Sequence, residues 1–449
     1  MKTKFKNLST ILAKVTFALF ISVSFLFVQC NGGGDNQNSD SDSTAVDDSI
    51  VKVVRQAGEF EKQARVWLIW SPLDHVTDMT NEDVTLRIID ALAPHVKIIV
   101  TVQNDSILQR AKDAIPAELV SSGQVELKLM PSEELWVRDM GPNFVELSNG
   151  EKAIADFNFD AWGYTPHDDM DDYTITMEKY DEAVGEMMGL KVISTDMYSE
   201  GGNRELNGKG TIMMNEVVEM GRNTNLSKEQ IENEFRRVLG VTNFVWLTKG
   251  VVEDDHTFLG PIDVEGGKAY TVITTNGHID EFARFVNANT ILLADVPEED
   301  LDDPVAAENK KRMDINYEIL KKAVDQDGKP FNIVRIPTPH TILRSMEPGD
   351  PVYDYISTLE YQDGSEFPVG EKITTIAASS YLNFLISNNV IVAQKYWKEG
   401  MDEAVKARDE EVKKILQEVF PKREIIMINA MPVNWGGGGV HCISMQEPA

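Results

Sequence analysis

The sequence contains two cysteines, and the residues before the second one suggest a reactive thiol. Cys442 closes the segment 436–442, which reads G-G-G-G-V-H-C. Four consecutive glycines are costly in backbone entropy, and packing alone does not explain them. Because glycine lets the backbone approach a ligand closely, we expect Cys442 at the wall of a pocket, with Gly438 and Gly439 beside the ligand. The alternative is a buried, inert thiol.

A histidine and an aspartate are separated by one residue in the segment 277–281, which reads G-H-I-D-E. In an extended segment, residues i and i+2 point to the same face, so His278 and Asp280 would face one space. They could serve as a general base and a cation-binding carboxylate. A metal site is the rival interpretation, but no further ligands at metal spacing occur nearby in the sequence.

Two further segments place carboxylates beside glycines. Segment 136–142, W-V-R-D-M-G-P, follows a predicted strand and could project Asp139 into a site, although an ion pair beside a turn would also explain it. Segment 200–203, E-G-G-N, could bring Glu200 and the backbone close to a ligand, or it could be a plain hairpin. Neither segment predicts a function by itself.

The composition excludes several classes of protein. The formal net charge is -30, which argues against a nucleic-acid partner and favours cationic small molecules or peptides. The sequence has no phosphate-binding glycine loop, no CxxC pair and no HExxH motif, so we expect neither a metal nor an organic cofactor. The 449 residues can bury a large core.

The N-terminal residues resemble a bacterial lipoprotein export signal. An apolar run over 15–28 is shorter than the roughly 20 residues that span a bilayer, and four lysines precede it. Cys30 follows this run, although Phe27 and Gln29 differ from the usual small residues. We therefore predict a signal peptide at 1–29, lipidation of Cys30, a flexible acidic tether at 30–51 and a folded domain at 52–449. The expected location is the cell envelope, with membrane attachment by the lipid anchor only.

The rest of the chain alternates short β-rich runs with amphipathic helical stretches, which predicts an α/β fold. Helices are expected at 83–93, 107–115, 309–324 and around 412–419, where Pro421 ends the last one. Strands are expected at 66–70, 96–102, 124–129, 291–293, 331–336 and 423–430.

Taken in order, the four segments resemble the agmatine deiminase family, which is grouped with the Porphyromonas-type peptidyl-arginine deiminases. Segments 159–163 and 380–384, F-D-A-W-G and S-Y-L-N-F, resemble the further family motifs F-N-A-W-G and S-Y-x-N-F. The resemblance covers roughly 65–449. It implies the pentein fold, an α/β propeller of ββαβ modules around a pseudo-fivefold axis, with the active site in a central channel.

The resemblance also implies a role for each residue. Asp139 and Asp280 match the carboxylate pair that holds a guanidinium fork. Cys442 matches the nucleophile, His278 the acid and base, and Glu200 the carboxylate that orients the histidine. Pocket positions are matched by Trp136, Trp162 and Asn383. The implied reaction converts agmatine and water to N-carbamoylputrescine and ammonia, a step in putrescine biosynthesis, through a Cys-linked intermediate.

The sequence is compatible with several substrates. No Lys or Arg occurs from Ala153 to Glu178, which favours a far end that is cationic or neutral, as in agmatine, although Arg204 could meet a carboxylate. An arginine in a peptide also fits, and it suits an exported protein, so peptidyl-arginine deimination is the alternative. Amidino transfer and a non-catalytic pentein surface lipoprotein are further alternatives. An insertion between Asp254 and Gly277 and the acidic stretch 167–172 depart from the family and could reshape the pocket mouth.

Overall fold

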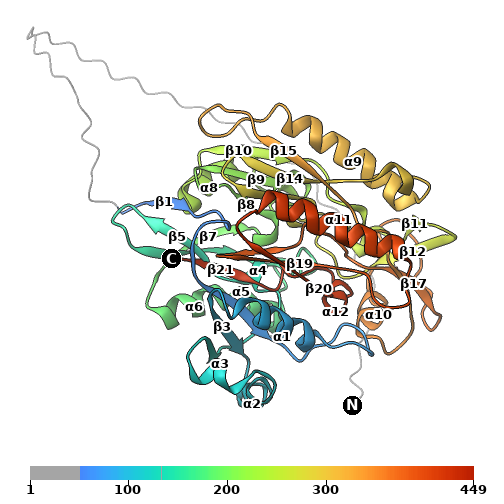
Figure 1. The fold of residues 1–449 in the computed structure, drawn as a ribbon, viewed down its shortest axis with the longest axis horizontal. Helices are drawn as coiled ribbons and strands as arrows, with labels where there is room; N and C mark the ends of the chain where they lie inside the picture. The colour runs from blue at the N-terminus through green and yellow to red at the C-terminus, as the bar shows by residue number, and fades with distance from the viewer. Residues whose placement is uncertain (1–50, 133) are drawn as a thin grey trace, which may run out of the picture. The chain divides into compact units, whose positions relative to one another are not determined.

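The computed structural model describes residues 51–132 and 134–449. The predicted signal peptide, Cys30 and the tether as far as residue 50 lie outside the described residues. Within the described part, no helix is both long and apolar enough to cross a bilayer. Helices and strands alternate along the chain, so the expected α/β class is confirmed (Figure 1).

Five of the six sheets in the described residues repeat one topology. In each, an antiparallel strand pair is extended by the next strand along the chain, which runs parallel to its neighbour. The triplets are β21 (Met445–Pro448), β2 (Gln63–Trp70) and β3 (Lys97–Val102); β5 (Asn143–Leu147), β6 (Lys152–Asn158) and β7 (Lys191–Tyr198); β8 (Glu205–Leu206), β9 (Thr211–Asn215) and β10 (Asn243–Leu247); β13 (Ala283–Asn287), β14 (Thr290–Asp295) and β15 (Asn332–Pro337); and β18 (Leu385–Ser387), β19 (Val390–Gln394) and β20 (Glu424–Ile428).

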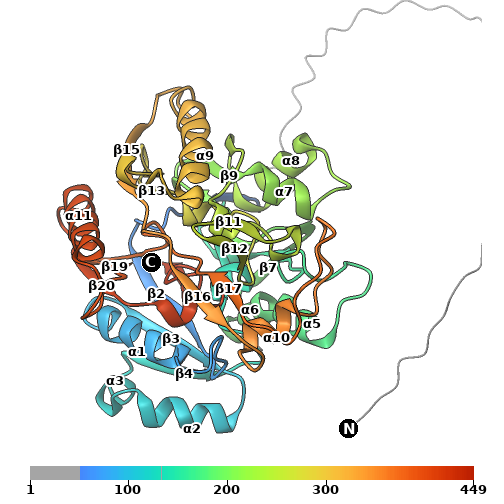
Figure 2. The ribbon, with the colours of Figure 1, turned by 90° about the vertical axis from the view of Figure 1, so that its right-hand side faces the viewer.

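A helical crossover precedes each parallel strand, because parallel neighbours cannot be joined by a tight turn. Helices α1, α8, α9 and α11 lie around the outside of the folded unit (Figure 2). The crossovers contain α1 (Asn81–Leu92), α5 (Asp172–Glu178) with α6 (Tyr180–Met188), α7 (Glu216–Arg222) with α8 (Lys228–Leu239), α9 (Pro304–Leu320) and α11 (Glu403–Val419). Further strands and helices that accompany the five sheets are β1 (Val53–Gln56), β4 (Val125–Leu129), α2 (Asp105–Ala114), α3 (Ala117–Ser121), α4 (Val137–Met140) and α12 (Met431–Asn434).

The helix expected at 309–324 begins and ends earlier, at Pro304 and Leu320. Asp303 caps it by accepting a hydrogen bond from the backbone N–H of Val305, and proline is favoured at the first helical position. On α11, Val412 and Leu416 are buried, as the apolar spacing predicted. Boundaries thus shifted by a few residues, whereas the types of these elements were predicted correctly.

The sixth sheet lies outside the repeated pattern and has the order β11-β12-β17-β16. We call it, together with α10 (Pro351–Ile356), the cap. Its first two strands lie in the insertion before Gly277. Its last two come shortly before the segment 380–384. The strands are β11 (Ile262–Val264), β12 (Gly267–Thr271), β16 (Leu343–Met346) and β17 (Ile373–Ile376).

Candidate active site

Three of the four chemically suggestive segments converge on Gly202. A Cβ atom at this position would lie 2.5 Å from Nδ1 of His278, 2.8 Å from Oδ1 of Asp139 and 3.2 Å from Oδ2 of Asp280. No side chain larger than hydrogen fits there without displacing these groups. The glycine of the E-G-G segment is therefore explained by the close approach of functional side chains rather than by a hairpin.

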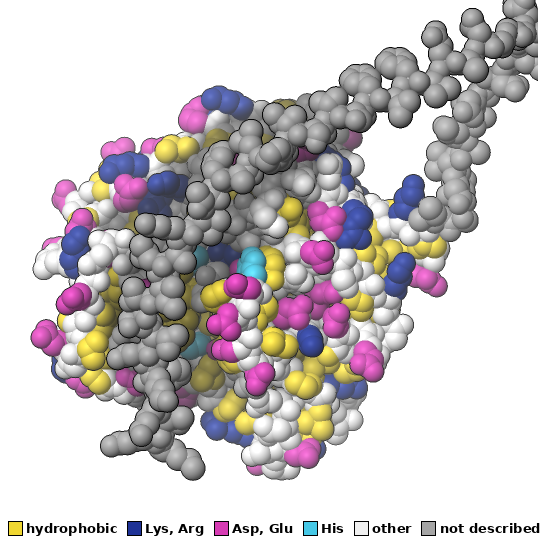
Figure 3. Space-filling view, turned by 180° about the vertical axis from the view of Figure 1, so that it is seen from behind, with side chains coloured by type: hydrophobic (Ala, Val, Ile, Leu, Met, Phe, Trp, Pro, Cys, Tyr) yellow, Lys and Arg dark blue, Asp and Glu magenta, His cyan; other side chains and the backbone are white. Residues whose placement is uncertain are grey.

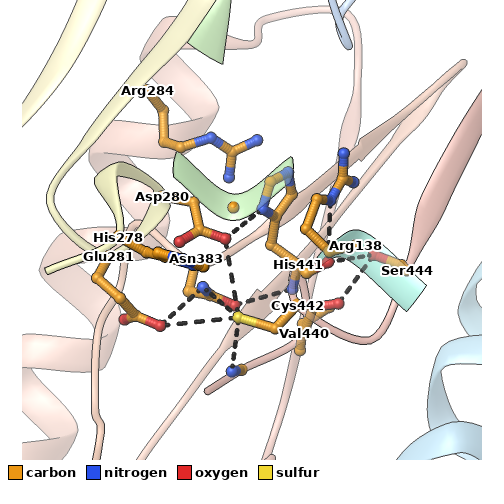
Figure 4. Close-up of polar contacts among 12 residues, drawn as sticks. Arg138, His278, Asp280, Glu281, Arg284, Asn383, Val440, His441, Cys442 and Ser444 are labelled. Atoms are coloured by element: carbon orange, nitrogen blue, oxygen red, sulfur yellow. Dashed lines mark hydrogen bonds and ion pairs between the residues drawn. The ribbon is translucent and has the colours of Figure 1, made fainter. Parts of the chain in front are cut away.

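Cys442 is buried, and its Sγ atom lies among donors and acceptors (Figure 4). Asn383 donates to Sγ through Nδ2 at 3.0 Å, and the backbone N–H of Gly439 donates at 3.4 Å. The carboxylates of Asp280 and Glu281 accept from Sγ at 3.7 and 3.9 Å. Burial and these carboxylates raise the pKa of the Cys442 thiol well above its usual value. The thiol is therefore protonated until a cation enters the site.

His278 is buried between two carboxylates. Its Nδ1 lies 3.7 Å from Oδ1 of Asp139, and its Nε2 lies 3.6 Å from Oε2 of Glu200. Burial by itself lowers the pKa of His278, but the Asp139 and Glu200 carboxylates outweigh it and raise the pKa to about 9. The imidazole therefore carries a proton at neutral pH and can act as a general acid.

Several polar atoms in this space have no hydrogen-bond partner among the described residues. They are Oδ1 of Asp280, Oε2 of Glu200 and both ring nitrogens of His278. The other oxygens are occupied: Asp139 accepts from Nε1 of Trp162 and from the N–H of Gly202, both at 2.8 Å. The ring nitrogens of His278 face Glu200 and Asp139 as ion pairs at 3.6 and 3.7 Å, so Oδ1 of Asp280 is the atom of this group that lacks a partner. Because buried polar groups are nearly always paired, this oxygen indicates the position of a polar ligand.

The glycines before Cys442 leave room for this ligand site. A Cβ atom on Gly438 would lie 2.7 Å from the ring of Trp136 and 2.8 Å from Sγ of Cys442. A Cβ atom on Gly439 would lie 2.5 Å from Oδ1 of Asn383. The structure thus brings these predicted pocket residues close to Cys442. Trp162 joins them through its hydrogen bond to Asp139.

A second buried cluster of charges supports the site from behind. His441 forms hydrogen bonds with two carboxylates. Its Nδ1 lies 2.6 Å from Oδ2 of Asp280, and its Nε2 lies 2.7 Å from Oε2 of Glu59. Arg284 donates to Glu59 at 2.7 Å and also to Glu205. Burial opposes ionisation of Glu59, but His441 and Arg284 hold its pKa well below the usual range. The cluster fixes the backbone on either side of Cys442 and the orientation of Asp280.

Comparison with known proteins shows which family has this arrangement. The family model for Porphyromonas-type peptidyl-arginine deiminase matches residues 55–448. The chain belongs to the Porphyromonas-type peptidyl-arginine deiminase family. It is 28% identical to the agmatine deiminase of Pseudomonas aeruginosa (strain LESB58) over 342 residues, which cover 74% of this chain and 78% of that protein.

Solved structures agree with this membership. The agmatine deiminase of Enterococcus faecalis is 26% identical, with a TM-score of 0.66, covering 88% of this chain and 95% of that one. The agmatine deiminase of C. jejuni is 19% identical, with a TM-score of 0.61, covering 89% and 96%, and that likeness concerns the fold alone.

Some features of this family member differ from the sequence expectations. The segment with His278 and Asp280 is not extended, because Ile279–Glu281 forms a 3-10 turn, yet both side chains still reach one space. Segment 136–142 does not follow its strand directly: β4 ends at Leu129, and Asp139 lies on the short helix α4. Arg204 is buried and donates to Ser199 and Asn143, so it faces no substrate carboxylate.

Asp254 has a role at the site that no motif in the sequence predicted. Its carboxylate accepts from the backbone N–H of His278 at 2.7 Å, from that of Gly277 at 3.0 Å and from the hydroxyl of Thr275 at 2.6 Å. Burial raises the pKa of Asp254 to about 6, although His278 opposes the rise. Asp254 therefore holds the loop that carries His278, and the only hint was its place at the start of the insertion.

Two groups of side chains in this family member have donor atoms within 4.8 Å of one another, close enough to share a metal ion. In the first, Glu59, Glu205 and His441, the guanidinium of Arg284 already neutralises both carboxylates. The second, Asp280, Glu281 and Cys442, surrounds the thiol itself. Neither group adds a site away from the cluster already described, and the absence of a metal requirement stays a prediction.

Proposed function

We propose that the chain hydrolyses agmatine to N-carbamoylputrescine and ammonia through a covalent intermediate on Cys442. The chain is a hydrolase that acts on the carbon–nitrogen bonds of amidines. The observation that supports the proposal best is the buried carboxylate oxygen Oδ1 of Asp280, which has no hydrogen-bond partner among the described residues and belongs to the side chain that accepts from the Cys442 thiol. A planar cation with several N–H donors would supply the missing partner beside the thiol.

The chemistry follows from the charges. A bound guanidinium between Asp139 and Asp280 offsets the carboxylates that raise the pKa of Cys442, so the thiol loses its proton to solvent as the cation binds and the thiolate forms. The thiolate attacks the central carbon and forms an S–C bond. As the C–N bond breaks, protonated His278 gives its proton to the nitrogen, which leaves as ammonia. Neutral His278 then takes a proton from water, whose oxygen attacks the same carbon and releases the ureido product and the thiol.

We also propose that the fold is a pentein propeller and that the protein is exported to the cell envelope. The five sheets with one topology support a pentein propeller, with modules around a common axis. The N-terminal sequence, with Cys30 after an apolar run, supports an exported lipoprotein. Retention of Cys442, His278, Asp139 and Asp280 argues against a surface protein that only binds. Figure 3 shows Asp and Glu side chains gathered in the middle of one face, with Lys and Arg mainly around its edge, which suits a cationic substrate.

The test is to incubate the folded domain, residues 51–449, with agmatine, free arginine and an arginine-containing peptide. Ammonia and the ureido product are measured for each substrate. Turnover of agmatine in preference to the other two is the expected result. Turnover of the peptide alone would replace the proposal with peptidyl-arginine deimination. Release of no ammonia from any of them, in a correctly folded protein, would refute deimination of these guanidines.

Glu200→Gln should shift the alkaline limb of the pH profile of kcat to lower pH by about 1 unit. The Glu200 carboxylate helps to raise the pKa of His278 to about 9, so protonated His278 is available below that pH and is lost above it. Removing the charge lowers this pKa, and the general acid is then lost at a lower pH. The profile is measured from pH 6 to 10, with the exposed Glu186→Gln as control. An unshifted limb would show that His278 does not depend on Glu200.

A further inference from the structure

Beside the catalytic cluster lies a pocket that is partly open to solvent, with mainly apolar walls and a volume of about 240 Å³. Trp136 and Trp162 form the boundary between the two spaces, since Trp136 approaches Gly438 beside Cys442 and Trp162 donates to Asp139. A guanidinium held by Asp139 and Asp280 would therefore extend its alkyl chain past these two rings. We call this space the distal compartment. Its lining residues are Leu73, Asp74, His75, Glu134, Trp136, Ala161, Trp162, Tyr164, Tyr173, Ile273, Pro351, Val352, Tyr355 and Gly436.

Tyr164 and the insertion before Gly277 meet in one wall of the distal compartment. Tyr164, which lies three residues before the acidic stretch 167–172, packs edge-on against Tyr355 of α10, with ring centroids 6.1 Å apart. Its hydroxyl accepts from the backbone N–H of Thr274 at 3.2 Å and lies 3.3 Å from Oγ1 of Thr257. Both threonines belong to the insertion. These contacts join Tyr164 to the insertion and to α10. The insertion supplies Ile273 to the wall, and α10 of the cap supplies Val352 and Tyr355.

Charge and size restrict what the distal compartment can take. No Lys or Arg occurs among the described residues that line it, and the charged side chains there are the acids Asp74 and Glu134. Burial lowers the pKa of His75 to about 4, so this histidine adds no positive charge at neutral pH. A carboxylate is therefore disfavoured. The volume exceeds the roughly 150 Å³ of an apolar cavity that holds benzene, which is more space than an unbranched alkyl amine fills.

We infer that the cap selects guanidinoalkyl substrates whose far end carries an aryl or similarly compact hydrocarbon group and no carboxylate. This inference rests on the proposed deimination and narrows its substrate class beyond agmatine itself. The guanidinium occupies the catalytic cluster, the alkyl chain passes Trp136 and Trp162, and the apolar group packs against Val352 and Tyr355. The reaction and its atom balance are unchanged, because the far end takes no part in bond breaking.

The test compares three probes: agmatine, N-benzoylagmatine and N-benzoylarginine. The expected result is a KM for N-benzoylagmatine about 10-fold lower than for agmatine, with a similar kcat, since the added contact forms equally in the ground and transition states. N-benzoylarginine should be the poorest of the three because of its carboxylate. Turnover of agmatine with no gain from the benzoyl group would overturn the inference and leave the proposed function intact.

Binding to the Cys442→Ala protein, measured by calorimetry, keeps the inference testable if no probe is turned over. Tighter binding of N-benzoylagmatine than of agmatine would support the distal compartment even if deimination failed. Equal or weaker binding would overturn it.

Substitutions in the cap test whether the benzoyl group contacts Tyr355. Tyr355→Ala should raise the KM for N-benzoylagmatine about 10-fold, with a smaller effect for agmatine, and Tyr355→Phe should restore most of the difference. Tyr355 is 39% exposed, so the substitution leaves the core intact. Tyr317→Ala, which removes a tyrosine from α9 away from the compartment, is the matched control and should keep the preference. Loss of the preference in both alanine variants, or in neither, would contradict the assignment.

Discussion

Replacing Cys442 with alanine is expected to lower kcat by roughly 10⁶-fold, the scale seen when an enzyme loses its nucleophile. The thiolate is the group proposed to form the bond to the guanidinium carbon, and no other nucleophilic side chain lies at the same place among the described site residues. The side chain is 6% exposed and small, so its loss creates little empty volume. Activity is measured as ammonia release, together with the thermal midpoint of unfolding.

Ser387→Ala provides a matched control for this variant. Ser387 is also buried and small, and its hydroxyl has no hydrogen-bond partner among the described residues. It should retain kcat within about 2-fold, as expected for a substitution outside the site. A Cys442→Ala protein that keeps measurable turnover near the wild-type rate would refute covalent catalysis, and mass spectrometry of the wild-type protein should detect an adduct on Cys442 during turnover.

Replacing Arg284 with methionine is expected to lower the free energy of unfolding by about 3–5 kcal/mol. The Arg284 guanidinium is fully buried and donates to Glu59, to Glu205 and to the backbone carbonyls of Leu382 and Phe384. Methionine preserves much of the volume but leaves two buried carboxylates without their shared cation. Denaturant-induced unfolding at pH 7 measures the loss.

The control is the same substitution at an exposed ion pair. Arg236 on α8 donates to Glu232 one turn away at the surface, and Arg236→Met should change the free energy of unfolding by less than about 1 kcal/mol. A similar, small loss in both variants would show that the buried cluster around Glu59 does not depend on Arg284. We also expect Arg284→Met to lower activity, since the same cluster orients His441 and Asp280.

Much of the site could be predicted from the sequence because its groups lie in short, glycine-flanked segments. The run before Cys442 and the turn at Gly202 have local causes, since a side chain at either place would collide with a functional atom. Such requirements leave a mark in the sequence itself. The α/β class was likewise predictable from the alternation of strands and amphipathic helices.

The supporting residues could not be predicted, because their partners are distant in the chain. Glu59 meets His441 across 382 positions, and no local pattern around Glu59 indicates a buried charge. Asp254 acts through backbone N–H groups of a loop that the insertion separates from it by more than 20 positions. The sequence showed only that an insertion is present. The cap sheet itself could not be predicted, because the pairing of β12 with β17 joins two segments that are distant in the chain.

The pairing of β2 with β21 has a consequence for how the enzyme forms. Arg65 and Glu447, 382 positions apart, bond across this pair, and Cys442 lies three residues before β21 begins. Contacts of such long sequence separation require closure of a very large loop, and folding rates fall as such contacts increase. During refolding, β21 can therefore join its sheet only after the two ends of the domain have met, so the segment that follows Cys442 takes its native place through a contact of very long sequence separation.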